Sequence, residues 1–372
     1  MIRLDQITLR EIRLPLREPF RISSGEVTER RITLLELRDV DGVTVWSEGV
    51  AGEQPNYSPE AIDTAWIAMT EWVAPRVLGR EFTHARDVFP VLEADFRGNL
   101  MAKAAVEMGM WVLEAQRRGV ALSTLLGGTR AAIATGISLG IQSSPERLVE
   151  KAQAAIAEGY RKVKIKIAPG QDVAYVRAAR EALPSAPLMA DANNAYTLND
   201  IELLAELDAF DLMMIEQPLA WDDLVQHATL QRRLTTPVCL DESITSVDRA
   251  RDMVTLGAGR IVNIKPGRVG GFTSSLAIHD YCLTHDIPVW CGGMLESGVG
   301  RACNVALASL PGFTKPGDLS PSARYWAQDV VTPEWTMTSD GMVPVPLATP
   351  GLGVAVDIDR IDALTVRRVV LR

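Results

Sequence analysis

Residues 162–170 read KVKIKIAPG, and this stretch decides how the rest of the chain is interpreted. Lys164 and Lys166 alternate with Val163, Ile165 and Ile167. Side chains of a β-strand point alternately to opposite faces, so the two ammonium groups share one face and the apolar residues share the other. Two cations at this spacing repel each other unless water screens them or anions lie nearby. The stretch therefore predicts a strand whose charged face meets either solvent or a group of carboxylates.

The same strand belongs to a regular alternation of short apolar strands and amphipathic helices. This alternation is typical of a parallel sheet, and it predicts a (β/α)8-type barrel, a modified TIM barrel, over residues 126–344. Seven strands are expected at 134–141, 162–167, 187–194, 212–219, 237–243, 261–267 and 287–293, and an eighth near 313–318 closes the barrel.

The chain before the barrel has a different pattern, which predicts an α+β capping domain over residues 1–125. Two apolar runs within 30–49 meet around Asp41-Gly42, a strong signal for a β-hairpin. Helices are expected at 61–74 and 99–119. The tail, about residues 345–372, ends in the strand-like TVRRVVLR, which we expect to return to the capping domain.

Five consecutive barrel strands end at a charged residue: Lys166, Asp191, Glu216, Asp241 and Lys265, which lie 25, 25, 25 and 24 residues apart. One βα unit has about this length, and the carboxyl ends of barrel strands form one mouth, where active sites lie. Three carboxylates on adjacent strands repel one another unless a cation lies between them, and oxygen ligands suit Mg²⁺. The spacing therefore predicts a magnesium site flanked by two lysines. Each acidic residue taken alone can also be a turn former or a helix cap, and the lysines can also belong to an exposed strand.

A metal flanked by lysines favours removal of a proton next to a carboxylate, because the metal stabilises the charge that develops. The lysine that accepts the proton must be neutral, so burial and neighbouring cations must lower its pKa. Lys164 is placed to do this for Lys166, and Arg268 for Lys265. A salt bridge within its loop is an equally good explanation of Arg268.

Several motifs resemble the muconate-lactonizing branch of the enolase superfamily, and more narrowly its o-succinylbenzoate synthase/N-succinylamino acid racemase group. They are VKIKI, DANNAY, IEQPL, LDES, NIKPGRVGG, WCGGMLESGVGRA and GDLSPSARYW, and the similarity covers nearly the whole chain. The resemblance implies that Asp191, Glu216 and Asp241 bind Mg²⁺, for which Mn²⁺ or another divalent ion can substitute. It implies that Lys166 and Lys265 form the acid/base pair and that Lys164 neutralises the substrate carboxylate.

The resemblance also implies residues that support the metal or contact substrate: Asn193, Arg268, Phe20, Ser24, Met294, Glu296 and Ser297. Cap segments 20–25 and 52–57 would close over the barrel mouth. Two activities are expected, syn dehydration to o-succinylbenzoate for menaquinone synthesis and racemisation of N-succinylamino acids. Muconate cycloisomerisation and dipeptide epimerisation are alternatives within the branch. A Schiff-base aldolase and a non-catalytic scaffold are alternatives of a different class.

Composition limits the class of partner. A net charge of −9 and a pI near 5.2 argue against a nucleic-acid binder, and no apolar run is long enough to cross a membrane. The N-terminus lacks the apolar core of a signal peptide, and four cysteines without a C-x-x-C pair favour a reducing compartment. We therefore expect a cytoplasmic protein that takes a small carboxylate substrate. From the resemblance we expect a homo-oligomer.

Overall fold

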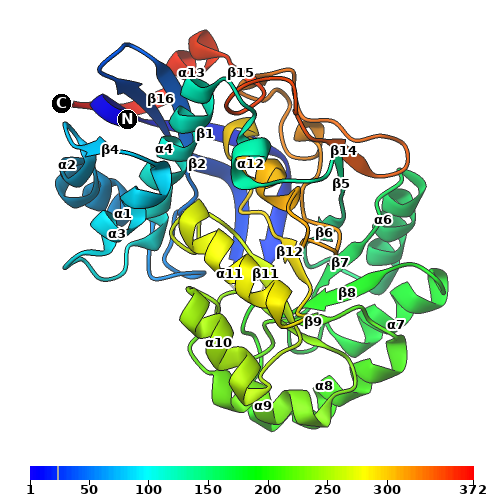
Figure 1. Cartoon of the computed structure of the whole chain (residues 1–372). Helices are drawn as coiled ribbons and strands as arrows, with labels where there is room; N and C mark the ends of the chain where they lie inside the picture. Colours follow the sequence, from blue (N-terminus) through cyan, green and yellow to red (C-terminus); the bar gives the residue numbers. More distant parts are fainter. Residues whose placement is uncertain (23–24) are drawn as a thin grey trace.

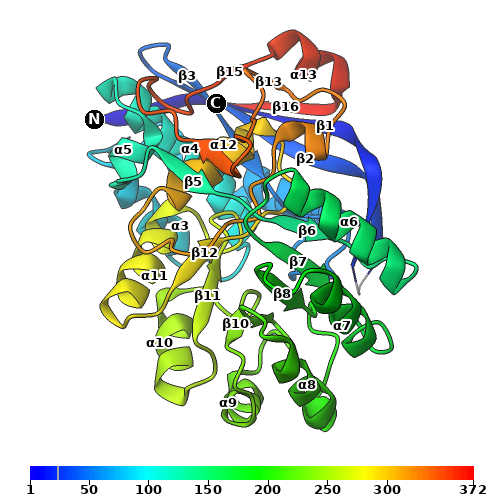
Figure 2. The same ribbon diagram turned by 90° about the vertical axis from the view of Figure 1, so that its right-hand side faces the viewer.

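The structure, a computed structural model, describes residues 1–22 and 25–372. An antiparallel sheet with its own helices lies against one end of a curled parallel sheet (Figure 1). Both termini lie on the antiparallel part, and Figure 2 shows the same arrangement from the side. This confirms the predicted α/β architecture with a separate N-terminal cap.

The cap sheet has the strand order β16-β1-β2-β3, and β4 pairs with β1 at a separate place. Asp39 ends β2, and its Oδ1 accepts hydrogen bonds from the backbone of Asp41 and Val43, which closes the predicted hairpin. The C-terminal strand β16 pairs antiparallel with β1, so the tail completes the cap as predicted. The strands are β1 (Ile2–Ile22), β2 (Gly25–Asp39), β3 (Thr44–Gly49), β4 (Glu81–Phe82) and β16 (Thr365–Leu371).

Helix α4 (Leu100–Arg118) is the central helix of the cap and packs on β3. Gly119 ends it with φ of +67°, the left-handed geometry that glycine adopts without strain. The helix expected at 61–74 extends to Val77 and contains a π turn. The other cap helices are α1 (Ile62–Ala68), η1 (Met69–Val73), α2 (Ala74–Val77), η2 (Ala85–Asp87), α3 (Val88–Glu93) and α5 (Leu122–Leu126).

The parallel sheet runs in the order β12-β11-β10-β9-β8-β7-β6, one strand for each of the seven predicted. Its strands are β6 (Ile137–Leu139), β7 (Val163–Lys166), β8 (Leu188–Asp191), β9 (Ile215–Glu216), β10 (Val238–Leu240), β11 (Ile261–Ile264) and β12 (Val289–Cys291). Lys166 pairs with Asp191, and Asp191 with Glu216, so the charged strand ends stand side by side. The predicted side-by-side placement is therefore confirmed for these three residues, whereas Glu216 pairs with Cys239, and Asp241 and Lys265 directly follow β10 and β11.

The eighth strand is reduced to single bridges. Phe313 bridges to Val289 of β12, and Gly317 bridges to Thr135 just before β6, so this segment joins the two edges of the sheet. Pro316 lies between them and has no N–H to donate, which prevents a continuous ladder.

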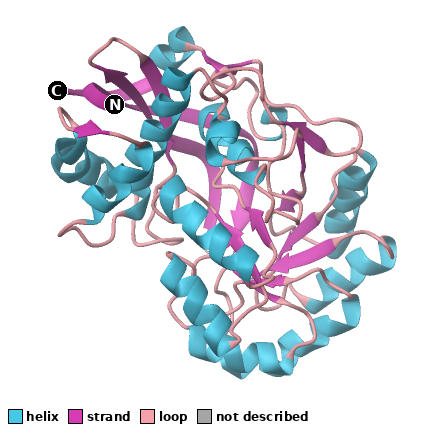
Figure 3. Cartoon of the chain, in the orientation of Figure 1, coloured by secondary structure: helices cyan, strands magenta, loops and turns pink. Residues whose placement is uncertain are grey.

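Helices surround the parallel sheet on its outer side (Figure 3). They are α6 (Pro145–Ala157), α7 (Val173–Ala182), η3 (Leu198–Asp200), α8 (Ile201–Glu206), η4 (Leu207–Phe210), α9 (Leu224–Arg233), α10 (Val247–Leu256), α11 (Phe272–Thr284) and α12 (Gly298–Ala308). The remaining elements are β5 (Ala132–Ala134), η5 (Ser322–Arg324), β13 (Val331–Thr332), β14 (Met342–Pro344), β15 (Ala355–Val356) and α13 (Ile358–Leu364). Within the described ranges, no helix combines the length and the hydropathy that crossing a membrane requires.

His227 anchors the loop after β9. Its Nε2 accepts a hydrogen bond from the backbone N–H of Leu219 at 3.2 Å, and its Nδ1 faces the carbonyl oxygen of Asp223. This geometry requires a neutral ring with the proton on Nδ1. Burial lowers the pKa of His227 below its usual value, because the charged ring is poorly solvated.

We expect His227 to contribute to acid lability. The unfolded chain takes up a proton on this ring as the pH falls below about 6.5, while the folded chain resists. Stability from this group is therefore complete above that pH and is lost below it, by at most about 1.4 kcal/mol per pH unit. Measuring the free energy of unfolding from pH 5 to 7.5 should show a shallower slope for His227→Gln. An identical slope would contradict the assignment.

Candidate active site

Three lysines lie on one face of β7 and of the residue that precedes it. Lys162 lies two residues before Lys164 on the same face and is completely buried. Its Nζ lies 2.9 Å from Asp318 Oδ1 and 3.7 Å from the ring centre of Trp290. Burial lowers the pKa of Lys162, and Asp318 opposes that effect. Lys162 was not predicted as a site residue, although the sequence shows its i, i+2, i+4 spacing with Lys164 and Lys166.

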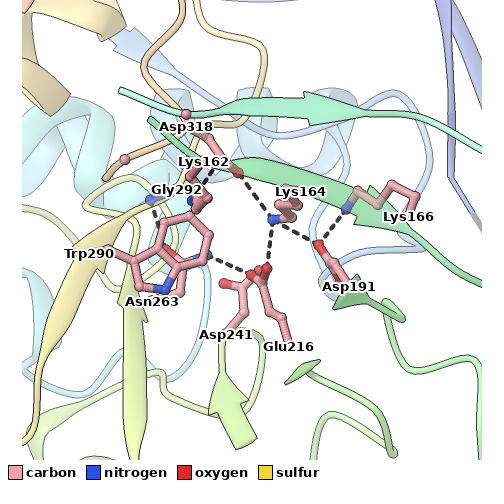
Figure 4. A network of polar contacts seen from close by, with 12 residues as sticks. Lys162, Lys164, Lys166, Asp191, Glu216, Asp241, Asn263, Trp290, Gly292 and Asp318 are labelled. Carbon is pink, nitrogen blue, oxygen red and sulfur yellow. Dashed lines mark hydrogen bonds and ion pairs between the residues drawn. The ribbon is translucent and has the colours of Figure 1, made fainter. Parts of the chain in front are cut away.

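Lys164 lies at the centre of a group of carboxylates (Figure 4). Its Nζ lies 2.8 Å from Asp191 Oδ2, 2.7 Å from Glu216 Oε2 and 3.1 Å from Asp318 Oδ2. Burial disfavours its charge, but these carboxylates outweigh burial and hold the pKa of the Lys164 ammonium well above its usual value. Buried carboxylates, rather than water, therefore compensate the charged face of the strand.

Lys166 and Lys265 form ion pairs with carboxylates on opposite sides of this group. Lys166 Nζ donates to Asp191 Oδ2 at 2.6 Å and to Asn193 Oδ1. Lys265 Nζ donates to Asp241 Oδ2 at 2.7 Å and to the hydroxyl of Tyr57 at 2.9 Å. Tyr57 belongs to the cap, so the cap contributes directly to the mouth of the barrel.

Arg268 joins the same cluster. Its Nε lies 3.1 Å from Asp241 Oδ1, and its guanidinium also donates to the backbone oxygens of Ile244 and Asn263. Asp241 thus faces a lysine and an arginine, which hold the pKa of its carboxyl below the usual value despite burial. Of the two explanations of Arg268, the structure shows the ion pair, which is made with Asp241 of the cluster. The expected lowering of the pKa of Lys265 is wrong for this arrangement, because burial disfavours its charge but Asp241 outweighs burial and raises its pKa.

The three predicted metal ligands lie at the ends of neighbouring strands, where Asp191 and Glu216 contact Lys164 and Asp241 lies beside Glu216 (Figure 4). Burial, together with the negative charges of Asp191 and Asp241, raises the pKa of Glu216 to about 7. Glu216 Oε2 is buried without a well-aligned hydrogen bond. Three carboxylates on neighbouring strands are the kind of oxygen ligands that a hard divalent cation prefers, so the residues present fit Mg²⁺ in their chemistry.

The side chains of the three predicted ligands are not arranged as they would be in a formed metal site. Within residues 1–22 and 25–372, no three His, Cys, Asp or Glu side chains are arranged so that they could hold a metal ion. Lysine ammonium groups contact the carboxylate oxygens instead, through Lys164 on Asp191 and Glu216 and Lys265 on Asp241. The three carboxylates therefore remain predicted ligands.

A cavity of about 140 Å³ opens between cap and barrel and contacts both flanking lysines. Its other lining residues are Phe20, Ile22, Val27, Arg30, Gly52, Gln54, Asn56, Tyr57, Ser58, Glu60, Met101, Asn193, Gly293, Met294 and Leu295. Phe20, Met294 and part of the segment 52–57 thus line this cavity, and their contact with substrate stays a prediction. Ser24 lies outside the described residues.

Glu296 and Ser297 do not line this cavity, which corrects their expected place beside the substrate. The backbone N–H and the hydroxyl of Ser297 both donate to Glu48 of β3, at 3.2 and 2.6 Å. Glu296 Oε1 accepts from Asn304 of α12 at 2.8 Å. Both residues are buried where the cap meets the beginning of α12, so their visible role is to hold the two parts together.

Four further residues complete the cluster and were not predicted individually. Asn263 donates to Glu216 Oε1 at 2.8 Å, and buried Glu242 accepts from Asn193 and Asn194. Asp318 and Tyr57 are the other two. Asp318 could have been predicted from the sequence, because it ends the expected eighth strand just as the five charged residues end their strands.

Both parts of the chain match known families. Residues 5–127 match "Mandelate racemase / muconate lactonizing enzyme, N-terminal domain", and residues 147–360 match "Enolase C-terminal domain-like". The o-succinylbenzoate synthase of Bacillus subtilis (strain 168) is 48% identical over 359 residues, which cover 96% of either chain. The N-succinylamino acid racemase of Thermus thermophilus is 46% identical over 364 residues, which cover 98% of either chain.

Solved structures agree with this fold. An enolase-superfamily member from Listeria innocua has a TM-score of 0.96 and 38% identity, over 100% of this chain and 99% of that one. A dipeptide epimerase from Cytophaga hutchinsonii, solved with Mg and the dipeptide D-Ala-L-Val, has a TM-score of 0.91 over 100% of both chains. At 24% identity, the second likeness shows the fold alone.

Proposed function

The chain belongs to the mandelate racemase/muconate lactonizing enzyme family of the enolase superfamily, and from this we propose that it removes a proton next to a carboxylate with the help of Mg²⁺. We propose syn dehydration to o-succinylbenzoate, racemisation of N-succinylamino acids, or both, because relatives with these two names are 48% and 46% identical to it. The observation that carries the proposal is a cavity between cap and barrel that contacts both Lys166 and Lys265.

Each flanking lysine has a defined task in this proposal. One lysine accepts the α-proton of the substrate, and in racemisation the lysine on the other side returns a proton to the opposite face. In syn dehydration the first lysine alone transfers protons, since the proton and the leaving hydroxide depart on the same face. Both lysines are nearly buried, at 9% and 5% exposure, which keeps bulk water away from the reacting carbon.

The remaining residues of the cluster bind the metal or stabilise negative charge on the substrate. Asp191, Glu216 and Asp241 are the proposed Mg²⁺ ligands. When bound, Mg²⁺ would supply a Lewis acid for the substrate carboxylate and positive charge that favours neutral lysine. Lys164, held by three carboxylates, offers an ammonium group to the negative charge that develops on the substrate.

Proton exchange in D₂O tests the proposal directly. With Mg²⁺ present, N-succinyl-L- and D-amino acids should gain deuterium at the α-carbon, as followed by proton NMR. A dehydration assay on the cyclohexadiene precursor of o-succinylbenzoate should run in parallel. Absence of both exchange and dehydration would contradict the proposal. Covalent trapping of a carbonyl substrate by borohydride, with activity insensitive to EDTA, would favour the aldolase alternative instead.

We also keep as proposals the properties that rest on the family resemblance or on composition. These are a homo-oligomer, a cytoplasmic location, a small carboxylate substrate, and domain limits at 1–125 with 345–372 and at 126–344.

A further inference from the structure

Arg30 is a buried cation in the wall of the cavity that contacts Lys166 and Lys265. It lies on β2 with 6% of its surface exposed. Its Nη2 donates to the backbone oxygen of Val50 at 3.1 Å, whereas its Nε is buried without a hydrogen-bond partner. Among the ion pairs of the described residues, none involves Arg30, so its guanidinium has no carboxylate in contact.

A buried charge without a partner is costly unless something compensates it. Glu48, Glu296 and Glu53 act on Arg30 only through space, and burial lowers the pKa of its guanidinium in spite of them. The charge of the neighbouring Arg31 is compensated in the usual way, because its guanidinium donates hydrogen bonds to the carboxylates of Glu11 and Asp63. Arg30 thus differs from Arg31 in facing a cavity instead of a protein carboxylate.

The other charged residues of the cavity wall already have hydrogen-bond or ion-pair partners within the protein. Glu60 accepts hydrogen bonds from the backbone N–H groups of Met101 and Ala102, at the beginning of α4. Lys166 and Lys265 are held by Asp191 and Asp241. The cap also contributes three apolar side chains to the wall of this cavity, Phe20, Ile22 and Val27. An anion entering this part of the cavity would therefore find Arg30 as its available charged partner.

We propose that Arg30 binds the free carboxylate of a succinyl group and so selects substrates with two separated carboxylates. The inference rests on the proposed function. The names of the two relatives, o-succinylbenzoate synthase and N-succinylamino acid racemase, have the succinyl group in common. The reacting carbon must lie between Lys166 and Lys265, and the carboxylate attached to it stays at the proposed metal ligands and Lys164. The second carboxylate is therefore left for the cap side of the cavity, where Arg30 lies. A planar guanidinium suits it, because it can donate two parallel hydrogen bonds.

The test compares an N-succinylamino acid with its N-succinamoyl counterpart, an uncharged isostere. Arg30→Gln should lower kcat/KM for α-deuterium exchange of the succinyl substrate by about 10- to 100-fold, mainly through KM, as expected for loss of a charge-assisted hydrogen bond. The succinamoyl substrate should change by less than about 3-fold. Calorimetry with N-succinylglycine, which measures binding without turnover, should show a comparable rise in Kd.

The control is Arg31→Gln, which removes a cation at the adjacent position outside the cavity. It should keep the wild-type ratio of kcat/KM for the two substrates. Equal losses on both substrates in Arg30→Gln would assign Arg30 a structural role and overturn the inference. Should Arg30→Gln fail to fold, wild-type protein that lacks a preference for the succinyl substrate would overturn it as well. Wild-type protein that exchanges neither substrate would instead contradict the proposed function.

Discussion

Replacing Lys265 or Lys166 with alanine is expected to lower kcat for racemisation by at least about 10³-fold, within the range that general acid–base groups contribute. Racemisation needs one lysine to remove the proton and the other to return it, so neither variant keeps the complete pair. Dehydration should depend more sharply on the lysine that removes the proton. Polarimetry measures racemisation, and deuterium exchange from each enantiomer identifies the face on which each lysine works.

The matched control is Lys151→Ala, which removes a lysine from the outside of α6, where it pairs with Glu18 at 2.9 Å. This variant should keep its rate within about 2-fold, because exposed ion pairs contribute little. A folded Lys166→Ala or Lys265→Ala variant with full racemase activity would remove the acid/base assignment. Circular dichroism on each variant establishes that the fold is intact.

Glu216→Gln is expected to weaken Mg²⁺ binding by at least about 10-fold, since even loss of a residue that only supports a ligand has effects of this size. Gln keeps the shape of the side chain, and its amide oxygen can still accept from Asn263, which bonds to Glu216 Oε1 at 2.8 Å. The charge at the centre of the carboxylate group is lost, and with it the attraction for a divalent ion. Titration calorimetry with Mg²⁺ measures the change, and EDTA should lower wild-type activity by about 10²-fold or more.

Glu242→Gln provides the comparison for metal binding. Glu242 is another buried carboxylate of the same cluster, and burial and Asp241 raise its pKa to about 8. It is not a proposed ligand, so its Mg²⁺ affinity should stay within about 3-fold of wild type. Unchanged Mg²⁺ affinity in Glu216→Gln, or activity that resists EDTA, would argue against the magnesium proposal.

Local patterns in the sequence were sufficient to predict the barrel and the five charged residues at the ends of its strands. Alternation along a strand and the length of one βα unit are properties of neighbouring residues, so periodicity reveals both. This is why Lys166, Asp191 and Glu216 could be expected side by side, and the register pairs them so. The same rule, applied to the short eighth segment, would have found Asp318.

Contacts between distant segments were decided by the tertiary structure alone. Tyr57 reaches Asp241 across 184 residues, and Ser297 reaches Glu48 across 249, which places Ser297 at the junction of cap and barrel rather than in the cavity. Arg30 and Arg31 are adjacent in sequence, yet only packing determines that one faces the cavity and the other faces carboxylates. The sequence by itself determined which side chains end the strands, because that depends on local periodicity. Only the tertiary structure decided which charges each one meets, because partners are selected by how distant elements pack.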